Sequence, residues 1–228
     1  MSNKNWNDKT VHTYEQEIGK KIPGYHVLFD LLGNMYSTIK KQSPELLIIG
    51  AGGGQDIITL SKKDREIRFT GVDPSLDMLR LAEFRLQQEQ IENEIELIHG
   101  TIAALSPAKQ FDGAICMLVL HFIQSIDNKK ELLQRIYGQL KPGSTFFLST
   151  IYRLEDTAEM AIFMQGWKDY MLQHGISLEQ WNRFEKAIGT EFHLITEQEL
   201  LELFETCGFK EVRSFFSNLL VKGYMMKK

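Results

Sequence analysis

The chain has 228 residues, of which 43% are hydrophobic and 25% are charged, and its formal net charge is −4. These values fit one globular domain over residues 1–228 and give no electrostatic sign of a nucleic-acid partner. No apolar run reaches the ~18 residues of a membrane-spanning helix, and the first residues lack the apolar segment of an export signal. We therefore expect a cytoplasmic protein that does not bind membranes.

Residues 8–42 are predicted to be helical, with an interruption at Pro23 and Gly24. The apolar residues of this segment recur at the spacing of one helix face: Leu28, Leu31, Leu32, Met35 and Ile39. A polar stretch then ends the segment. Residues 1–43 are therefore predicted to form an N-terminal helical cap.

Apolar strand patterns and amphipathic helix patterns alternate through residues 44–151. The predicted strands are 46–49, 67–72, 95–98, 113–118 and 145–149. The predicted helices between them are 55–62, 76–89 and 128–140. Continuous apolar strands separated by helices are typical of a parallel sheet covered on both faces, so this region is the predicted core.

Residues 152–195 break this alternation and are predicted to form a helical insertion. The segment is rich in aromatic residues and is too long for an ordinary connection: Phe163, Trp167, Tyr170, Trp181, Phe184 and Phe192. These side chains could pack against the sheet, cover a binding site as a lid, or do both.

The last predicted unit, residues 196–228, holds a helix and two strands. The capping-box pattern of Thr196 and Glu199 begins the helix, and two strands follow at 212–216 and 219–226. Only two residues separate these strands, which predicts an antiparallel hairpin. The predicted fold class is therefore α/β: a Rossmann-like seven-stranded, mostly parallel sheet with an antiparallel C-terminal hairpin, helices on both faces and a helical lid insertion.

A glycine-rich loop follows the first predicted strand, in the stretch "LLIIGAGGGQDI". Glycines at 50, 52 and 54 let the backbone approach a ligand closely, because they carry no Cβ. A dinucleotide loop would have a further glycine where Gln55 stands, and the G-K-[ST] of a P-loop is missing. The loop therefore predicts a cofactor site and disfavours both of these cofactor types, with a tight turn that holds no ligand as the alternative.

Asp73 follows the second predicted strand in the stretch "FTGVDPS". A carboxylate at the tip of this strand can accept both hydroxyls of a ribose lying across the strand ends. The alternative is a surface aspartate that caps the next helix. After the third strand, "HGTI" places Thr101 and Ile102 at the same edge, where an adenine would lie.

The fourth predicted strand leaves the sheet in the stretch "FDGAICMLVLHFI". Residues Met117 to His121 are expected to border the crevice at the strand ends. His121 is either a base, a substrate contact or a structural histidine behind the site. The two cysteines, Cys116 and Cys207, match no metal-ligand spacing, so no metal site is predicted.

Taken in order, "LLIIGAGGG", "GVDPS", "HGTI", "FDGAICMLVLHFI" and "LKPGSTFFLS" resemble the motifs of class I S-adenosylmethionine (SAM)-dependent methyltransferases. The resemblance covers residues 44–149 by motif and the C-terminal strands by layout. The stretches "IPGYH", "LLQRIYGQLKPG" and "FFSNLLVKGYMMKK" are similar to the carboxy-SAM synthases, to their tRNA methyltransferase-like relatives and to UbiE-like members. The resemblance implies SAM as the cofactor and S-adenosylhomocysteine as the product.

The resemblance also implies which residues bind SAM, with the ribose on Asp73 and the methionine moiety over the glycine loop. The implied cofactor contacts are Tyr25, Gly50, Ala51, Gly52, Gly54, Asp73, Pro74, Met78, Thr101, Ile102, Met117 and Leu118.

The chain departs from these families at two positions. Most class I methyltransferases have an acidic residue two places before the first glycine, where this chain has Ile48. Carboxy-SAM synthases hold their extra carboxylate with an arginine in the last helix, where alignment through "CGF" places Leu203. The first departure leaves the methionine end of SAM without its usual support, and the second disfavours carboxy-SAM synthesis.

We therefore expect an enzyme, a SAM-dependent methyltransferase that acts on a small apolar or aromatic acceptor, as a monomer or a homodimer. His121 is the first candidate base, and Tyr14, Tyr152 and His193 are weaker candidates. Three alternatives remain: a carboxy-SAM synthase-like enzyme, a SAM-binding protein without catalytic activity, and a nicotinamide oxidoreductase. Gln55 and the closing hairpin argue against the last.

Overall fold

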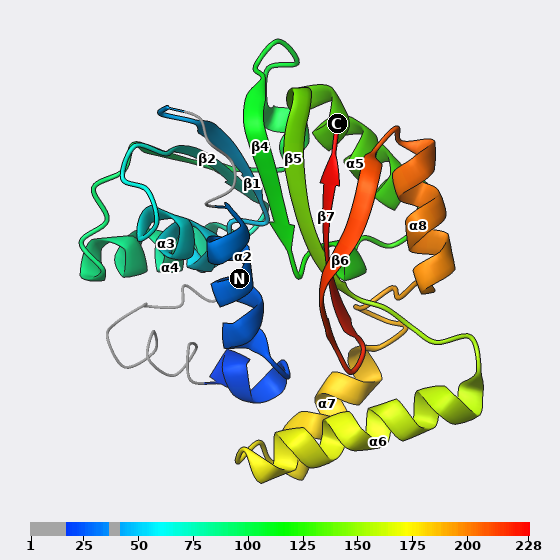
Figure 1. The fold of residues 1–228 in the computed structure, drawn as a ribbon. Helices are drawn as coiled ribbons and strands as arrows, with labels where there is room; N and C mark the ends of the chain where they lie inside the picture. Colours follow the sequence, from blue (N-terminus) through cyan, green and yellow to red (C-terminus); the bar gives the residue numbers. More distant parts are fainter. Residues whose placement is uncertain (1–16, 37–41) are drawn as a thin grey trace.

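The computed structural model describes residues 17–36 and 42–228 (Figure 1). Expectations for residues 8–16 and 37–41, and for Tyr14, lie outside the described residues. Helical residues at 17–21 lead into helix α2, Tyr25–Tyr36, after the predicted interruption at Pro23 and Gly24.

A seven-stranded sheet with the order β3-β2-β1-β4-β5-β7-β6 forms the centre of the molecule. β7 alone runs antiparallel to its neighbours, so the predicted fold class is confirmed. The strand bounds are β1 Glu45–Ile49, β2 Arg68–Asp73, β3 Ile95–His99, β4 Phe111–Met117, β5 Leu140–Ile151, β6 Lys210–Asn218 and β7 Val221–Lys227.

Helices lie on both faces of this sheet, as Figure 1 shows. Ser75 caps α4 by accepting a hydrogen bond from the Met78 amide, and Thr196 with Glu199 forms the predicted capping box of α8. Ser125, Asp156 and Ser177 cap α5, α6 and α7 in the same way. The helices are α3 Gln55–Ser61, α4 Leu76–Gln88, α5 Ile126–Gln139, α6 Thr157–Gln173, α7 Leu178–Ala187 and α8 Glu197–Thr206, with short 3-10 turns η1 Ile102–Ala104 and η2 Leu120–Phe122.

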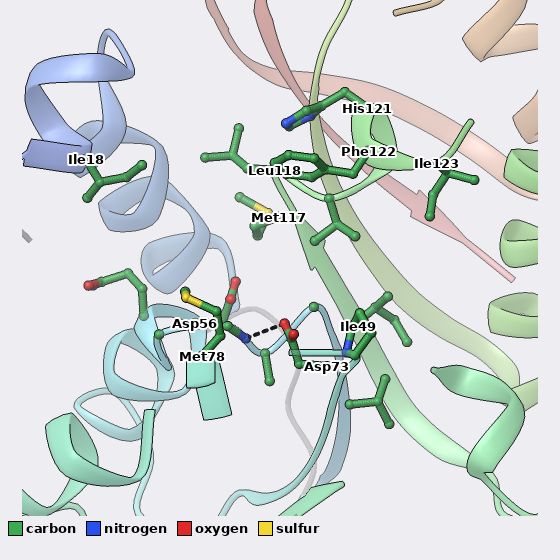
Figure 2. A pocket seen from close by; sticks show the side chains of 18 of the residues that line it. Ile18, Ile49, Asp56, Asp73, Met78, Met117, Leu118, His121, Phe122 and Ile123 are labelled. Carbon is green, nitrogen blue, oxygen red and sulfur yellow. Dashed lines mark hydrogen bonds between the residues drawn. The ribbon is translucent and has the colours of Figure 1, made fainter. Parts of the chain in front are cut away.

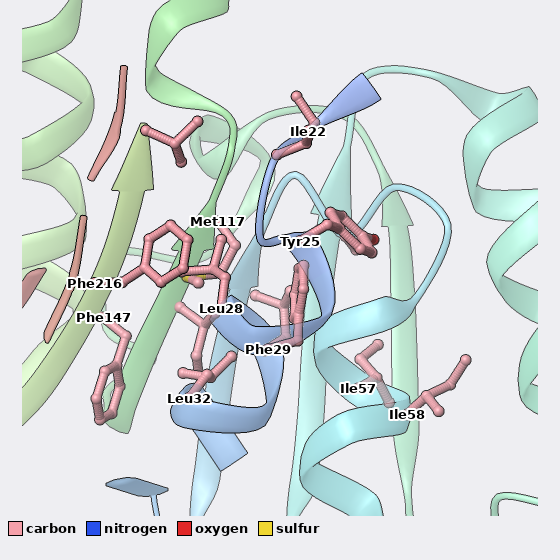
Figure 3. Packing of buried hydrophobic residues seen from close by; sticks show 14 of the residues in the cluster. Ile22, Tyr25, Leu28, Phe29, Leu32, Ile57, Ile58, Met117, Phe147 and Phe216 are labelled. Carbon is pink, nitrogen blue, oxygen red and sulfur yellow. The ribbon is translucent and has the colours of Figure 1, made fainter. Parts of the chain in front are cut away.

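Two hydrophobic cores fill the spaces between the sheet and its helices. Successive residues of β1 enter different cores, because side chains alternate across a strand: Ile48 belongs to the first core and Ile49 to the second. The first core includes residues of α2, α3 and α4, and Figure 3 shows Leu28 and Phe29 of α2 packing toward Met117 of β4. The second core includes residues of α5 and α8.

Several boundaries differ from the predictions by a few residues, and two of these differences lie in the C-terminal half of the sheet. β5 begins at Leu140, so the "LKPGS" stretch belongs to the strand rather than only leading into it. The hairpin turn is at Leu219 and Leu220, not at the predicted Ser217 and Asn218. Leu220 is fully buried and its carbonyl accepts a hydrogen bond from the Tyr152 amide, so tertiary packing places the turn.

The insertion forms α6 and α7, which lie beyond the carboxyl ends of the parallel strands (Figure 1). Trp167 of α6 donates a hydrogen bond to the Lys21 carbonyl at 2.7 Å, and Tyr170 donates one to the Gly19 carbonyl at 2.8 Å. The insertion is therefore joined to the N-terminal segment. None of the helices within residues 17–36 and 42–228 is long and apolar enough to cross a membrane.

Because Trp167 is fully buried and packs on Phe184 at 5.0 Å, it should carry much of this attachment. We expect Trp167→Ala to lower the free energy of unfolding by about 3–5 kcal/mol, measured by urea denaturation. Ile162→Ala on the same helix is the control, since Ile162 is 70% exposed and should change stability by no more than about 0.5 kcal/mol. Equal effects of the two variants would contradict this role for Trp167.

Candidate cofactor and substrate site

A pocket of about 590 Å³ opens at the carboxyl ends of β1, β2 and β4. Figure 2 shows Asp56, Asp73 and Met78 on one side of it, and Leu118, His121 and Phe122 on the other. The volume falls in the range of small-molecule and cofactor sites. The pocket brings together every predicted cofactor contact except Gly54: Tyr25, Gly50, Ala51, Gly52, Asp73, Pro74, Met78, Thr101, Ile102, Met117 and Leu118.

The glycine loop begins with Gly50, whose backbone has a φ of +67°. A Cβ at this position would overlap Cγ2 of Val119, which belongs to the loop after β4. The amides of Gly50 and Ala51 both donate to the Val72 carbonyl, at 2.9 and 3.0 Å. Residue 50 is therefore a glycine for two reasons: its backbone conformation and the close approach of Val119.

Gly54 has a different role from the one predicted. It is the N-cap residue of α3 with a φ of 76°, and a Cβ there would lie 3.3 Å from the Cβ of Ala82 on α4. It is not among the residues that line the pocket. The absence of a side chain at Gly54 therefore serves the close packing of α3 on α4.

The carboxylate of Asp73 joins the ends of β1 and β2. Its Oδ2 accepts a hydrogen bond from the Gly52 amide at 2.9 Å, and its Oδ1 accepts one from the Ser75 amide at 2.8 Å. Each oxygen of an ionised carboxylate has two lone pairs, so both can still accept a hydroxyl. The residues at this edge therefore fit a nucleoside, with Asp73 available to its ribose.

His121 lines the pocket at η2 and is 4% exposed. Its Nδ1 accepts a hydrogen bond from the Ile151 amide at 3.3 Å and lies 3.4 Å from the Thr150 hydroxyl. Burial, with a smaller contribution from the Lys129 ammonium, lowers the pKa of His121 to about 3. A neutral imidazole whose Nδ1 accepts the Ile151 amide carries its proton on Nε2, so it fits the substrate-contact role among the three predicted ones better than that of a base.

The ammonium of Lys129 supports the turn that carries His121. Lys129 is 1% exposed, and its Nζ donates to the carbonyls of Leu120 and Ile123 at 2.7 and 2.5 Å. Desolvation by burial lowers the pKa of Lys129 to about 8. Leu118, just before this turn, has a left-handed φ of 58°, and its amide donates to Ser149. This irregular backbone points the residues after β4 into the pocket.

Several lining residues were not predicted from the sequence. Asp56, on the first turn of α3, is buried and lines the pocket, and its place two residues after the last glycine was the available signal. Phe184 and Phe192 reach the pocket from the insertion, and the run of aromatic residues there was their signal. Tyr152 and His193, two weaker base candidates, do not line the pocket within the described part of the chain. That part also holds no cluster of three metal-binding side chains.

The chain is similar to known proteins in its sequence and in its fold. Residues 47–146 match a family model described as a methyltransferase domain. The carboxy-S-adenosyl-L-methionine synthase 1 of Yersinia pseudotuberculosis is 23% identical over 97% of this chain and 92% of its own length. The family model, such relatives and the fold together support a class I SAM-dependent methyltransferase.

Two solved structures show the same fold. A SAM-dependent methyltransferase from Methanosarcina mazei has a TM-score of 0.62 and 20% identity, over 85% of this chain and 96% of its own. Human N-acetylserotonin methyltransferase, in complex with SAM, has a TM-score of 0.61 and 18% identity, over 96% of this chain and 55% of its own. These structures show the fold, whereas the family model and the carboxy-SAM synthase relatives support S-adenosylmethionine as the cofactor, in a pocket whose residues fit it.

Gly50→Ala should destabilise the protein by about 2–4 kcal/mol, because the new Cβ meets Val119 and a non-glycine residue is strained at this φ. Chemical denaturation measures this loss. The matched control is Gly138→Ala in α5, where a Cβ would meet nothing within 4 Å and a small gain in stability is expected. A Gly50→Ala protein as stable as the control would contradict the proposed packing.

The tautomer of His121 can be measured directly by long-range ¹H–¹⁵N correlation spectra, with His121→Asn to assign the signals. We expect the Nε2–H tautomer and no titration between about pH 5 and pH 8. Because the folded pKa lies below the usual ~6.5, unfolding takes up a proton below that pH, and the contribution of His121 to stability declines from there toward pH 3. Titration near neutral pH would restore His121 as a candidate base.

Proposed function

We propose that the protein transfers the methyl group of SAM to a small-molecule acceptor of apolar or aromatic character. The observation that carries this proposal is the pocket itself: the residues that fit a nucleoside share it with an aromatic wall from the insertion. Phe192 of this wall lies 5.2 Å from Phe122 and 5.6 Å from Phe184, between ring centroids. Such a wall suits an apolar or aromatic acceptor better than a polyanion.

When bound, SAM supplies a methyl group on a positively charged sulfur. A lone pair on the acceptor would form the new bond to the methyl carbon as the carbon–sulfur bond breaks, which would leave S-adenosylhomocysteine as the product. The chain contributes mainly by holding the two partners in line, an effect that can be worth about 7–11 kcal/mol. Asp73 would hold the ribose, and the residues after β4 would border the acceptor.

The tautomer of His121 bears on which methyl acceptors the protein can use. An imidazole that already carries its proton on Nε2 can orient an oxygen or nitrogen of the acceptor by donating a hydrogen bond. It has no free lone pair with which to remove a proton, because Nδ1 is occupied by the Ile151 amide. We therefore favour acceptors that are nucleophilic without help from a base.

Carboxy-SAM synthesis is the second candidate function, because curated relatives with that name match almost the whole chain. An extra carboxylate on the cofactor would require a cation nearby. Within the described lining the one Lys or Arg side chain is Lys21, whose Nζ pairs with Glu17 at 2.6 Å. Leu203, at the position aligned with the synthase arginine, is buried in the second core. These observations favour methyl transfer.

Mass spectrometry can distinguish the two reactions and test the cofactor. We expect SAM and S-adenosylhomocysteine, but not NAD, to raise the melting temperature of the purified protein. Incubation with SAM and a panel of small aromatic and apolar acceptors should release S-adenosylhomocysteine with a methylated product. Incubation with SAM and prephenate should yield no carboxy-SAM.

Three outcomes would overturn the proposal. Carboxy-SAM formation would establish the second candidate function. SAM binding without S-adenosylhomocysteine release from any acceptor would indicate a binding protein without catalytic activity. Stoichiometric binding of tRNA at physiological salt, without turnover of small molecules, would indicate a nucleic-acid partner. The cytoplasmic location and the monomeric or homodimeric state stay predictions from the sequence.

A further inference from the structure

The methionine end of SAM carries an ammonium group, and the residue that usually supports it is missing from β1. Ile48 stands at that position, is fully buried in the first core and does not line the pocket. If the pocket holds SAM, another group must replace the missing carboxylate. Transfer of an ammonium group from water into a largely apolar pocket costs free energy unless a carboxylate or another acceptor pairs with it.

Asp56 is a buried carboxylate in the right part of the pocket. It lies two residues after Gly54, on the first turn of α3, and is 5% exposed. Its Oδ1 has no hydrogen-bond partner within the described part of the chain. Figure 2 shows Asp56 beside Met78, on the same side of the pocket as Asp73 and opposite His121. A buried carboxylate oxygen in this position is unsatisfied until a donor enters the pocket.

The cation that acts on the pKa of Asp56 is Arg85, which is already engaged in other hydrogen bonds. Arg85 of α4 donates one hydrogen bond to the Gly53 carbonyl and another to the Gln55 side chain at 2.8 Å. These bonds fasten the guanidinium under the glycine loop. Neither bond reaches Asp56, so its Oδ1 keeps no hydrogen-bond partner within the described residues.

We propose that Asp56 binds the α-ammonium group of the methionine moiety of SAM, in place of the acidic residue that β1 lacks. This inference rests on the proposed SAM-dependent function. It gives the cofactor two carboxylate anchors from different elements: Asp73 at the end of β2 for the ribose, and Asp56 on α3 for the amino acid. The contributions of the two carboxylates to affinity can be measured separately, with one ligand that contains both the ribose and the amino acid and another that contains the ribose alone.

A change in the protonation of Asp56 would give a second, independent signal of its contact with the ammonium group. Burial raises the pKa of Asp56 to about 7, against a smaller lowering by its own backbone amide and by Arg85. The thiol of Cys116 lies near it on β4 and is held neutral, since burial raises its pKa. Asp73 and Lys21 are the other charged side chains of the described lining. An incoming ammonium would favour the ionised carboxylate, so binding should release a proton near neutral pH.

The experiment measures the affinity of the full-length protein for two ligands by isothermal titration calorimetry. S-adenosylhomocysteine contains the ammonium, whereas 5′-methylthioadenosine has the same nucleoside and thioether but no amino-acid part. We expect Asp56→Asn to weaken S-adenosylhomocysteine binding at least tenfold and to change 5′-methylthioadenosine binding less than twofold. Asp73→Asn, the matched control, should weaken both ligands by similar factors.

The outcomes separate this inference from the proposed function. If the wild type binds neither ligand, the SAM-dependent function fails. If Asp56→Asn binds S-adenosylhomocysteine as tightly as the wild type, or weakens both ligands equally, the Asp56 assignment alone fails. Loss of methyl transfer with unchanged S-adenosylhomocysteine affinity would also overturn it, because Asp56 would then act on the acceptor.

A measurement on the wild type keeps the inference testable even if the variant does not fold. Titrations at about pH 7 in two buffers of different ionisation enthalpy give the number of protons exchanged on binding. We expect S-adenosylhomocysteine to release a fraction of one proton and to bind more tightly as the pH rises through about 7. 5′-Methylthioadenosine should release none. Equal proton release by both ligands, or none by either, would overturn the assignment.

Discussion

The hydrogen bond from the Gly52 amide to the Asp73 carboxylate, 2.9 Å long, is the interaction on which the rest of the site depends. It fixes the glycine loop after β1 to the end of β2, and the Ser75 amide holds the other carboxylate oxygen at the start of α4. Parallel strands bring such loops to one edge of the sheet. The loop is further limited by Val119, which occupies the space beside Gly50. The loops that follow β1, β2 and β4 are therefore held against one another, and the pocket forms where these three loops meet.

Burial then decides what each polar group in the pocket can do. His121 sits between Thr150 and Ile151 of β5, and its loss of charge follows from that packing rather than from its residue type. Asp56 is buried in the lining of the same pocket, and its Oδ1 has no hydrogen-bond partner within the described residues. The neutral donor and the unsatisfied acceptor lie on opposite sides of the pocket (Figure 2). One side of the pocket therefore offers a hydrogen-bond donor and the other side offers an acceptor, although most of the lining is apolar.

The strands of the sheet and the glycine loop could be predicted because their signals are local. β1 is a run of apolar residues buried on both faces, and a run of that kind followed by glycines has few other interpretations. The remaining features depend on tertiary packing. Ser217 and Asn218 are good turn residues, yet the chain turns at Leu219 and Leu220 because Leu220 fills the first core. Likewise, Gly54 resembles a ligand-binding glycine in sequence, and only the approach of Ala82 shows its packing role. The place of Asp56 just after the glycines is visible in the sequence, but its burial, on which its proposed role depends, is a result of tertiary packing.

The antiparallel strand β7 has a consequence for the order in which the sheet assembles. β6 has no direct pairing with β5, since β7 lies between them, and so it joins the sheet only through its hairpin partner. Hairpins form in about 1–10 μs, much faster than most whole domains fold. The local pairing of β6 with β7 is therefore expected to form before β7 pairs with β5. The cofactor edge, formed by β1, β2 and β4, has no strand pairing with β6 or β7, so its backbone hydrogen bonds do not depend on the hairpin.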